Sequence, residues 1–538
     1  QQLPYDTEDL EDLLYRDESS SLPEALAGAV TDWDHMPLNL NTASAEELES
    51  AGIFTSYQAY QLLKYRKAYG PLFSIHELAV LPGFDPSVIT KIESLVCLSK
   101  HDNPDGKKRG KHMVLLDLNR AFPDSEMDPK YKGPLMKSSL RIRSQVLSKL
   151  SLAFSYEKDA GEKFLHGKIP QFMSGYLSYK GNKYLQHLVL GNYQLRQGLG
   201  LVNGAGFIHR PGDFRVSSHS FSGIRPYSSL TESGYEQGMA CQLGSRGIQC
   251  ILWMSYHKFS VSPSALLGDP GTDGWLEYQS SSGLFRTASE LAGRDLAFRG
   301  HTGMQLLYRK QGFRMGILCG NQWIGAAKNA ASLLGTIPPP SLHPNLSLHS
   351  NWYGEKFRVF GELAASRSGS LAFLLGTSCQ FNDFISGSLL LHHYGREYRG
   401  TLPSSYSAGS HIRNEQGLAF FLHMENSGNT IINFSAELFQ YLWPRYLTRV
   451  PSQGYRLDIS LLNPLKPPLQ WKVRMVSKLW QTTPAHAGSK MRPLLDSRVN
   501  RIDGQVSYEL EERFRWQSRL LLGYCMHQKK GSTGYALV

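Results

Sequence analysis

Apolar and polar residues alternate along many segments between His112 and the end of the chain. Residues 471–479 place apolar and basic side chains on opposite faces: Trp471, Val473, Met475 and Leu479 against Lys472, Arg474 and Lys478. The stretch 514–524 repeats this pattern, and 140–143 and 357–360 begin further runs of it. Because successive side chains of a strand point to opposite faces, this alternation predicts β-strands.

The strands are expected to form a large antiparallel transmembrane β-barrel. Strands of about ten residues separated by turn residues suit a barrel, because every backbone polar group must pair inside the hydrocarbon layer. Aromatic faces opposite cationic faces favour the barrel over a β-helix or soluble sandwiches. Residues 531–538 lack the aromatic-terminated closing strand that is common in outer-membrane proteins. We therefore expect either a different closure or a C-terminal portion beyond this sequence.

Residues 37–99 follow a helical pattern instead. Ser44 is placed to cap a helix whose first turn carries Glu46 and Glu47, which suits the positive end of the helix dipole. Glycine and proline then divide the region into short segments. The further helices are expected over 56–69, 74–80 and 86–95. The sequence therefore predicts a small all-α N-terminal domain before a mainly β protein.

Four regions follow from these patterns. Residues 1–36 form an acidic leader, 37–99 the helical domain, 100–111 a basic linker and 112–538 the barrel. The chain opens without Met, as a protein trimmed after export or a recombinant product would, and we expect export.

Composition narrows the classes of protein that remain. Of the 538 residues, 41% are hydrophobic and 19% charged, and no run of roughly 18 apolar residues occurs, so a transmembrane helix is not expected. The formal net charge of +11 fits nucleic acid, anionic headgroups or a cation-lined pore, and equally a solvated lumen with basic loops. Six cysteines have no metal-ligand spacing. Cys241 and Cys250 would face each other across a Ser245-Arg246 turn, as a disulfide or as two thiols.

Motifs that carry enzyme chemistry are missing from the sequence. It contains no P-loop, no G-x-S-x-G elbow, no H-E-x-x-H and no C-x-x-C pair. The doublet His392-His393 would point to opposite faces of a strand, which is poor geometry for one metal ion. We therefore expect no enzyme, no metal and no cofactor.

The helical region resembles the competence-type helix-hairpin-helix family, which are DNA receptors bound to the cell surface. The resemblance rests on the lead Asn39-Leu40-Asn41-Thr42-Ala43 and on Tyr65-Arg66-Lys67 before Tyr69-Gly70-Pro71. It implies that each hairpin presents backbone N–H groups, freed by two glycines, to a DNA phosphate. Here Phe54 and Asp85 stand where the second glycines are expected, after Gly52 and Gly83. Both hairpins therefore lack the second glycine that this mode of DNA contact uses. The candidate residues for DNA or a partner are Gly52, Ile53, Thr55, Lys64, Arg66, Lys67, Gly83, Phe84 and Lys91.

A wider resemblance covers most of the chain. The segment Leu190-Gly191-Asn192-Tyr193-Gln194-Leu195-Arg196-Gln197-Gly198-Leu199-Gly200-Leu201 resembles bacterial helix-hairpin-helix proteins with a C-terminal outer-membrane barrel. Members of that family usually run longer, and the resemblance implies no activity. The glycines of this segment are expected where strands bend or pass an inward plug. Thr287 and Glu290 form a candidate capping box. The candidate charge network inside the barrel is Arg225, Glu232, Arg286, Glu290 and Glu362.

Three functions remain open at this point. The first is a non-enzymatic barrel in outer-membrane lipid whose periplasmic helical domain docks a periplasmic or outer-membrane protein in an envelope assembly or transport complex. The second is DNA binding or uptake through the helical domain, which a basic stripe across both hairpins would favour. The third is a transport pore, which an obstructed lumen would count against.

Overall fold

The computed structural model describes most of the barrel and part of the helical domain. The described residues are 38–43, 48, 56–81, 84, 89, 96–98, 111–120, 130–147, 149–166, 169–170, 172–181, 184–204, 223–230, 233–245, 247–263, 283–310, 312–331, 339–354, 356–382, 384–409, 411–425, 430–445, 448, 450–463, 469–483, 494–510, 514–529 and 532–537. The leader 1–36 and nearly all of the linker 100–111 lie outside them.

The helical domain is held by short elements around one apolar cluster. Its elements are β1 (Leu38–Asn39), α4 (Ser56–Tyr69), the 3-10 helix η1 (Ile75–Val80) and β2 (Val96–Cys97). β1 and β2 pair in parallel and so join the two ends of the domain. Leu40, Leu62, Leu78 and Phe84 belong to its buried cluster. The helix expected over 56–69 is confirmed with those bounds, and the one expected over 74–80 is a 3-10 helix over Ile75–Val80. The helix expected over 86–95 lies almost wholly outside the described residues.

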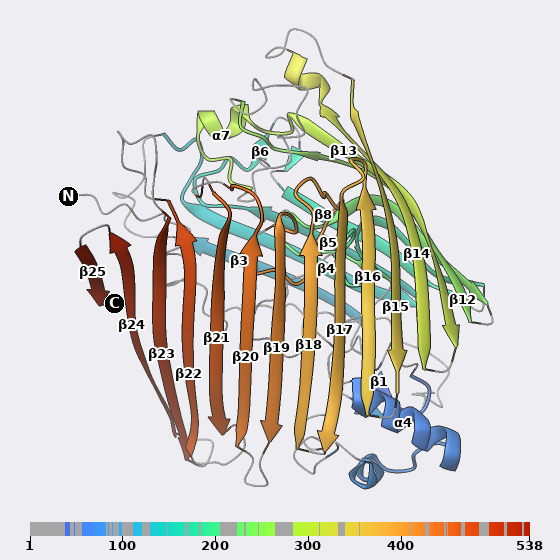
Figure 1. The fold of residues 1–538 in the computed structure, drawn as a ribbon. Helices are drawn as coiled ribbons and strands as arrows, with labels where there is room; N and C mark the ends of the chain where they lie inside the picture. Colours follow the sequence, from blue (N-terminus) through green and yellow to red (C-terminus); the bar gives the residue numbers. More distant parts are fainter. Residues whose placement is uncertain are drawn as a thin grey trace.

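The rest of the described chain is a barrel of antiparallel strands (Figure 1). In chain order they are β3 (Lys111–Arg120), β4 (Met136–Leu147), β5 (Leu150–Lys158), β8 (Phe172–Lys180), β9 (Leu185–Arg196), β10 (Gly223–Pro226), β11 (Glu236–Ser245), β12 (Ile248–Phe259), β13 (Ala297–Lys310), β14 (Phe313–Ala326), β15 (Ser341–Tyr353), β16 (Phe357–Ser366), β17 (Leu371–Asn382), β18 (Ile385–Tyr394), β19 (Glu415–Glu425), β20 (Ile431–Tyr441), β21 (Ser452–Asn463), β22 (Leu469–Thr482), β23 (Leu495–Leu510), β24 (Phe514–Lys529) and β25 (Ser532–Leu537). The connections add β6 (Leu165–His166), β7 (Ile169–Pro170), α7 (Ala288–Ala292) and the 3-10 helix η6 (Lys328–Ala330).

Backbone registers run from strand to strand around the wall. They join β3, β4, β5, β8, β9 and β11 in turn, and then each strand to its successor as far as β25. The short β10 pairs with the end of β9, and β25 and β3 stand at the seam of the barrel order. The strands predicted around 471–479, 514–524, 140–143 and 357–360 are confirmed as parts of β22, β24, β4 and β16.

The wall is apolar outside and polar inside. On β15 the large apolar side chains are about half exposed, and the residues between them are buried: Leu342, Leu346, Leu348 and Trp352 against His343, Asn345, Ser347, His349 and Asn351. β16 and β18 repeat this arrangement, with Leu363, Leu389 and Leu391 outside. A soluble protein would have the opposite arrangement, whereas a membrane barrel presents its apolar face to lipid. The predicted transmembrane barrel is thus confirmed by which side chains are buried.

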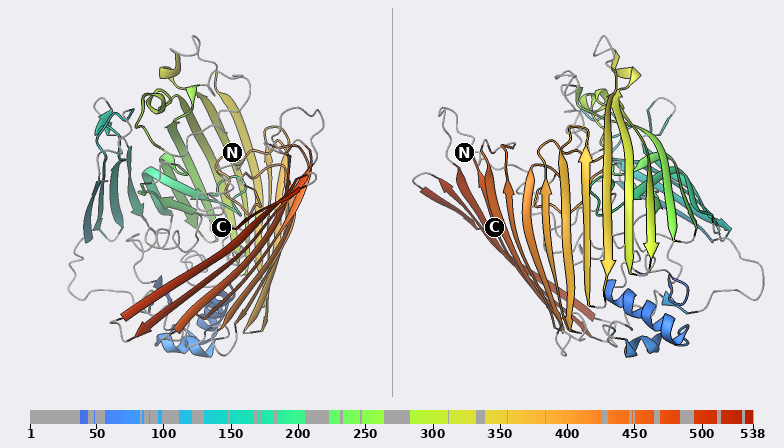
Figure 2. Two further views of the ribbon diagram at one scale, coloured as in Figure 1. Left: turned by 90° about the vertical axis from the view of Figure 1, so that its left-hand side faces the viewer. Right: turned by 45° about the vertical axis from the view of Figure 1, so that its right-hand side comes forward.

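The two ends of the barrel differ in the length of their connections. At one end β11 ends at Ser245 and β12 begins at Ile248, and β13 ends at Lys310 before β14 begins at Phe313. At the other end long connections run from Phe259 to Ala297 and from Tyr394 to Glu415. Since the connection from β3 to β4 belongs to the long-loop end, the first residue of β3 lies at the short-turn end. Both views of Figure 2 place the helical domain at that end.

The predicted turn between the two cysteines was wrong by one residue. Ser245 pairs with Ile248, so Ser245 belongs to the strand pair and not to the turn. Cys241 consequently lies opposite Leu252 and Cys250 opposite Leu243, and both thiols are free.

The capping box at Thr287 and Glu290 is confirmed in α7. The expectation for His392 and His393 is also confirmed, because His392 is buried in the lumen and His393 lies on the other face.

Candidate functional site

The glycine-rich segment that follows β9 folds into the barrel. Gly198 and Gly200 have φ of +60° and +86°, a region that residues with a side chain rarely adopt. A Cβ atom on Gly198 would lie 2.7 Å from the carboxylate of Glu362, and one on Gly200 would lie 2.3 Å from the backbone oxygen of Ser404. Glycine is therefore required here because other parts of the chain approach the backbone closely, as predicted for an inward plug.

Glu362 on β16 holds this segment. Its Oε2 accepts hydrogen bonds from the backbone N–H of Leu199 at 2.6 Å and of Leu201 at 3.3 Å. Its Oε1 accepts one from the hydroxyl of Ser347 at 2.6 Å. The side chain is only 3% exposed. A buried carboxylate must be hydrogen-bonded to offset its lost hydration, and backbone amides fill that role here.

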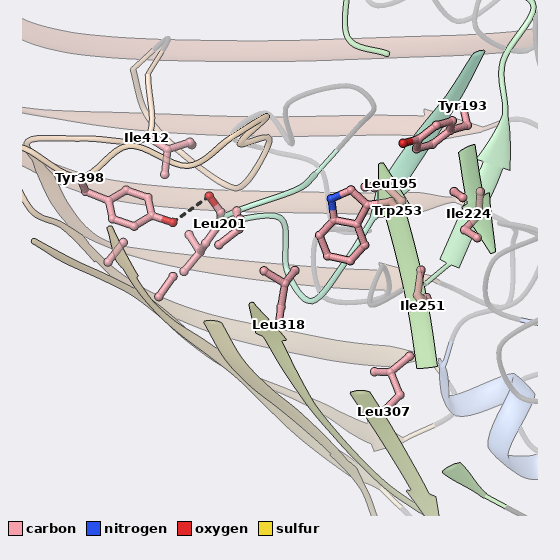
Figure 3. Packing of buried hydrophobic residues seen from close by; sticks show 14 of the residues in the cluster. Tyr193, Leu195, Leu201, Ile224, Ile251, Trp253, Leu307, Leu318, Tyr398 and Ile412 are labelled. Carbon is pink, nitrogen blue, oxygen red and sulfur yellow. Dashed lines mark hydrogen bonds between the residues drawn. The ribbon is translucent and has the colours of Figure 1, made fainter. Parts of the chain in front are cut away.

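A second loop, residues 395–414 between β18 and β19, lies beside the first. Leu402 exchanges backbone hydrogen bonds with Val202 and Gly204, at 3.0 and 2.9 Å. The hydroxyl of Tyr398 donates to the backbone oxygen of Leu201 at 2.9 Å, as Figure 3 shows. These bonds join the two loops into one body, which we call the plug: residues 197–204, 395–409 and 411–414.

Glu415 anchors the second loop as Glu362 anchors the first. Its carboxylate accepts the backbone N–H groups of Ala408 and Gly409 at 2.8 and 2.9 Å, and the hydroxyl of Ser407 at 2.8 Å. His392 Nε2 lies 2.8 Å from the same carboxylate. Each inward loop is thus fastened to the wall by a buried glutamate that binds adjacent amides.

Apolar side chains fill the space between the plug and the wall. Leu201 and Val202 are 0% exposed and belong to one cluster with side chains from β9, β12, β13, β14, β17 and β18. Figure 3 shows Leu201 and Tyr398 on the plug side of this cluster, and Trp253, Leu307 and Leu318 on the wall side. A second cluster places Leu199 against Phe360, Leu374 and Tyr406. Interiors packed in this way leave few voids as large as a water molecule, so the plug obstructs the lumen beside these strands.

One buried group resembles a hydrolytic triad in composition only. His301 Nδ1 lies 3.1 Å from Glu236, and Trp253 donates to His301 Nε2 at 3.0 Å, which assigns the proton to Nδ1. Ser255 donates to Glu236 at 2.5 Å and not to the histidine. An activated serine would need the histidine as its base. Among the described residues, moreover, no group of three or more His, Cys, Asp or Glu side chains could hold a metal ion.

The residues that carry the helical-domain resemblance hold that domain together. The amide of Asn41 donates to the backbone oxygens of Leu72 and Leu98 at 2.8 and 2.9 Å, and accepts from Leu72 N–H at 2.7 Å. Arg66 donates to the backbone oxygen of Ala43 at 2.6 Å. The Tyr65 hydroxyl donates to Glu77 at 3.1 Å. These motif positions therefore specify the fold of the domain, whichever ligand it binds.

Glu77 repeats the amide-binding pattern in exposed surroundings. It completes a capping box with Ser74 and accepts the backbone N–H groups of Phe73 and Ser74, each at 2.9 Å. The backbone N–H of Ser74 is the main cause that holds the pKa of Glu77 below its usual value. The N–H of Phe73 and the hydroxyl of Tyr65 add to this effect, and burial opposes it. The carboxylate thus caps the first turn of η1.

The predicted ligand-contact residues of the helical domain are only partly described. Lys64 and Lys67 are exposed on α4, whereas Arg66 is half-buried against Ala43 and Phe84 is 3% exposed in the domain core. The others lie outside the described residues: Gly52, Ile53, Thr55, Gly83 and Lys91.

The predicted charge network is distributed over separate elements. Arg286 and Glu290 come together at 3.2 Å beside α7. Arg225 lies on β10. Glu362 accepts hydrogen bonds from Ser347 and from the backbone N–H of Leu199 in the plug. Glu232 lies outside the described residues. Sequence reasoning did not select Glu415 as a site residue. The available signal was its position directly after a loop rich in Gly and Ser.

Comparison with known proteins supports the helical part of this architecture. A family model described as the helix-hairpin-helix motif matches residues 35–97. The chain combines an antiparallel β-barrel with apolar side chains on its outer face and a region that matches the helix-hairpin-helix motif. No curated protein matches the sequence. Among the described residues, no helix is long and apolar enough to cross a membrane.

Several solved structures are similar to the chain at low identity. Wzi of Escherichia coli, an outer-membrane protein involved in group 1 capsule assembly and a carbohydrate-binding β-barrel, is 10% identical with a TM-score of 0.36, covering 81% of this chain and 92% of its own. OccAB3 of Acinetobacter baumannii is 9% identical with a TM-score of 0.30, covering 80% and 92%. An anion-selective porin of Comamonas acidovorans is 10% identical with a TM-score of 0.25, covering 71% and 93%.

Proposed function

We propose that the protein is a non-enzymatic outer-membrane anchor whose helix-hairpin-helix domain docks a protein partner in the periplasm. The single observation that carries the proposal is the plug. A transport pore needs an open lumen, and here Leu201 and Val202 are fully buried between the plug and the wall. A barrel whose lumen is obstructed by a packed plug serves best as a membrane anchor for the domain that it carries.

The connections of the barrel support the orientation. In outer-membrane barrels the short turns face the periplasm and the long loops face outward. The chain enters β3 at Lys111 on the short-turn end, so a domain that precedes β3 emerges on the periplasmic side. The acidic leader precedes the same domain.

An exposed apolar face on the helical domain supports the docking of a protein. Tyr69, Phe73 and Val80 are 77%, 89% and 77% exposed, although this domain has its own buried core. Tyr69 packs on Tyr65 with ring centroids 5.0 Å apart, and Tyr65 and Phe73 N–H both bond to Glu77. On a 3-10 helix Val80 lies on the same side as Glu77. These three exposed side chains therefore stand on segments that are linked through Glu77, and exposed apolar side chains on one domain typically mark protein contacts.

Site-specific photo-crosslinking in intact cells tests this docking. A photoreactive amino acid placed at Phe73 or Val80 of the full chain should give one discrete protein adduct, identified by mass spectrometry. The same probe at Lys67 is the matched control and should not give that adduct. Lys67 lies nearly opposite Tyr69 around the axis of α4. The double variant F73S/V80S should lose the adduct without loss of folding, since both side chains are exposed. Equal adducts from all three positions would contradict a defined docking face.

The same cells separate docking from DNA binding. If adducts at Lys67 contain DNA and those at Phe73 contain no protein, the uptake function replaces the docking function. Salt-dependent binding of duplex DNA to the full chain is the supporting measurement, because neutralised phosphates make affinity fall steeply with salt.

A further inference from the structure

Two arginines of the described barrel wall are buried on its inward face, and they differ in their partners. Arg299 on β13 is 3% exposed, and Arg358 on β16 is 4% exposed. Arg358 Nε donates to Asn351 at 2.8 Å, and its guanidinium lies 4.9 Å from the ring centre of Phe360. Arg299 has one hydrogen bond within the described part of the chain, from Nη2 to the backbone oxygen of Tyr235 at 3.5 Å. Its Nε is buried and has no partner among those residues. A buried guanidinium N–H in that state calls for a polar group beside it.

The buried carboxylate of Glu236 balances the charge of Arg299 without bonding to it. The two charges act on each other, but no ion pair joins them among the described residues. Glu236 instead accepts the hydroxyl of Ser255 at 2.5 Å and Nδ1 of His301 at 3.1 Å. The N–H groups of Arg299 therefore stay available while its charge is already offset. A singly charged ligand group suits this balance better than a doubly charged one, because Glu236 repels every further negative charge.

His257 adds a second polar atom beside Arg299. The two residues are directly opposite each other across the β12–β13 register, and both belong to the inward face. His257 Nδ1 is buried and has no hydrogen-bond partner in the part of the chain that the structure describes. The residue as a whole is only half-buried, so the position is not sealed from solvent. The pair is one inward step from Phe259 and Ala297, at the long-loop end of both strands. Arg299 and His257 thus stand near the mouth of the barrel at that end.

Stacked tyrosines border this pair. The rings of Tyr227 and Tyr235 stack with centroids 4.9 Å apart, and Tyr235 contacts His257 edge to face at 5.0 Å. The segment after β10 that carries them is fastened to the wall. Its backbone oxygens accept hydrogen bonds from three side chains of β5, β8 and β9: Ser155 at 2.7 Å, Ser174 at 3.0 Å and Gln194 at 2.9 Å. The surroundings of Arg299 are consequently fixed before a ligand arrives, and their apolar character strengthens a charge contact.

We propose that Arg299 and His257 bind the carboxylate of a small organic anion at this mouth of the barrel. The planar guanidinium presents Nε–H and an Nη–H in the paired geometry that a carboxylate matches. His257 supplies a further hydrogen bond from Nδ1. The carboxylate lies in the buried part of the site, and the body of the ligand extends toward the mouth. This site is separate from the docking face of the helical domain, so each can be present without the other.

Titration of the purified full-length protein in detergent tests the site. Benzoate and galacturonate carry the carboxylate on an aromatic ring and on a sugar ring. Benzamide and galactose are their neutral counterparts, and phenyl phosphate presents a doubly charged group. Saturation-transfer NMR reports binding, with protein-free micelles as the blank. We expect at least one of the two carboxylates to bind more tightly than its neutral counterpart, and benzoate to bind more tightly than phenyl phosphate. The carboxylate that binds identifies the body of the ligand.

The variants are R299K, H257F and the control R367K. R299K keeps the charge that balances Glu236 and loses the planar fork, so carboxylate binding should weaken about tenfold or more. H257F keeps a ring beside Tyr235 and loses Nδ1, so the loss should be about three- to tenfold. Arg367 is exposed in the turn between β16 and β17, and R367K should bind like the parent. Electrophoretic heat-modifiability verifies that each barrel is folded, and H257F decides the matter if R299K does not fold.

Three results would overturn the proposal. The first is that neither carboxylate binds more tightly than its neutral counterpart. The second is unchanged binding by folded R299K or, in its absence, by folded H257F, which would place the carboxylate elsewhere on the molecule. The third is tighter binding of phenyl phosphate than of benzoate, which would assign the site to a doubly charged group.

Discussion

The wall of the barrel follows the same pattern at β15 and at β22, but the lumen is packed beside β15 and solvated beside β22. β15 and β22 both alternate apolar outward residues with polar inward residues. Beside β15 the inward residues are buried under the plug, and beside β22 they remain in contact with solvent. The alternation therefore defines the wall of the barrel, while its contents depend on which loops fold inward.

The same difference decides how carboxylates are satisfied. In the packed part Glu362 and Glu415 bind backbone amides of the plug. In the solvated part Asp458 binds Arg474 and Arg456 instead. Amides approach a carboxylate closely only where a loop is folded onto it, whereas long arginine side chains reach across an open face.

The largest effect is expected from Glu362→Ala. It removes the acceptor of two backbone N–H groups and of Ser347, and buried polar groups left without partners cost about 2–5 kcal/mol in total. The midpoint of heat-modifiability should fall, and conductance in planar bilayers should rise above that of the unaltered protein. Glu362→Gln retains an acceptor and should lose less. If Glu362→Ala unfolds and conducts like the parent, the plug is not fastened by this carboxylate.

Gly200→Ala should act on the same part of the lumen with a smaller effect. Its Cβ atom would meet the backbone oxygen of Ser404 at 2.3 Å, and φ of +86° is strained for alanine. We expect a loss of about 1–3 kcal/mol and faster proteolysis of the plug. Gly369→Ala is the control for strain alone, because it has φ of +72° but nothing within 4 Å of its Cβ position. Equal losses for both variants would show that the contact between position 200 and Ser404 is unimportant.

Arg474→Met tests the solvated part and should cost less again. Asp458 would keep Arg456 at 3.3 Å and would gain access to water, so we expect about 1 kcal/mol. The same heat-modifiability measurement suffices, and bilayer conductance should not change. A loss as large as that of Glu362→Ala would mean that the two parts of the lumen do not differ in packing.

The smallest effect is expected at Glu77, which binds two amides outside the barrel. Its pKa is held low, mainly by the N–H of Ser74, so its contribution to stability is present above its ordinary pKa and is lost as the pH falls through the lowered value. Hydrogen exchange of η1 in the full chain, normalised to β15, should rise only under acidic conditions below about pH 4. Glu77→Gln should remove this pH dependence. An unchanged acid response in that variant would assign it to another group.

The sequence predicted the parts of the fold that depend on neighbouring residues. Helix α4, the capping box at Thr287 and Glu290, and the alternation of β22 all rest on residues a few positions apart. Gly198 and Gly200 indicated either a bend in a strand or an inward plug, and the structure shows the plug. The turn between Cys241 and Cys250 failed by one residue, because the choice between neighbouring turn positions depends on the register of whole strands.

By itself, then, the sequence determined the helical domain, the barrel wall and which wall face meets lipid, because caps and periodicity are local properties. Only the tertiary structure decided what fills the barrel. Glu362 meets Leu199 across 163 residues of chain, and Tyr398 meets Leu201 across 197. Arg474 likewise meets Asp458 from a neighbouring strand, and the register between β21 and β22 sets their spacing. Such contacts join distant segments through loops that fold onto the wall, and no local pattern records which carboxylate will receive which amides.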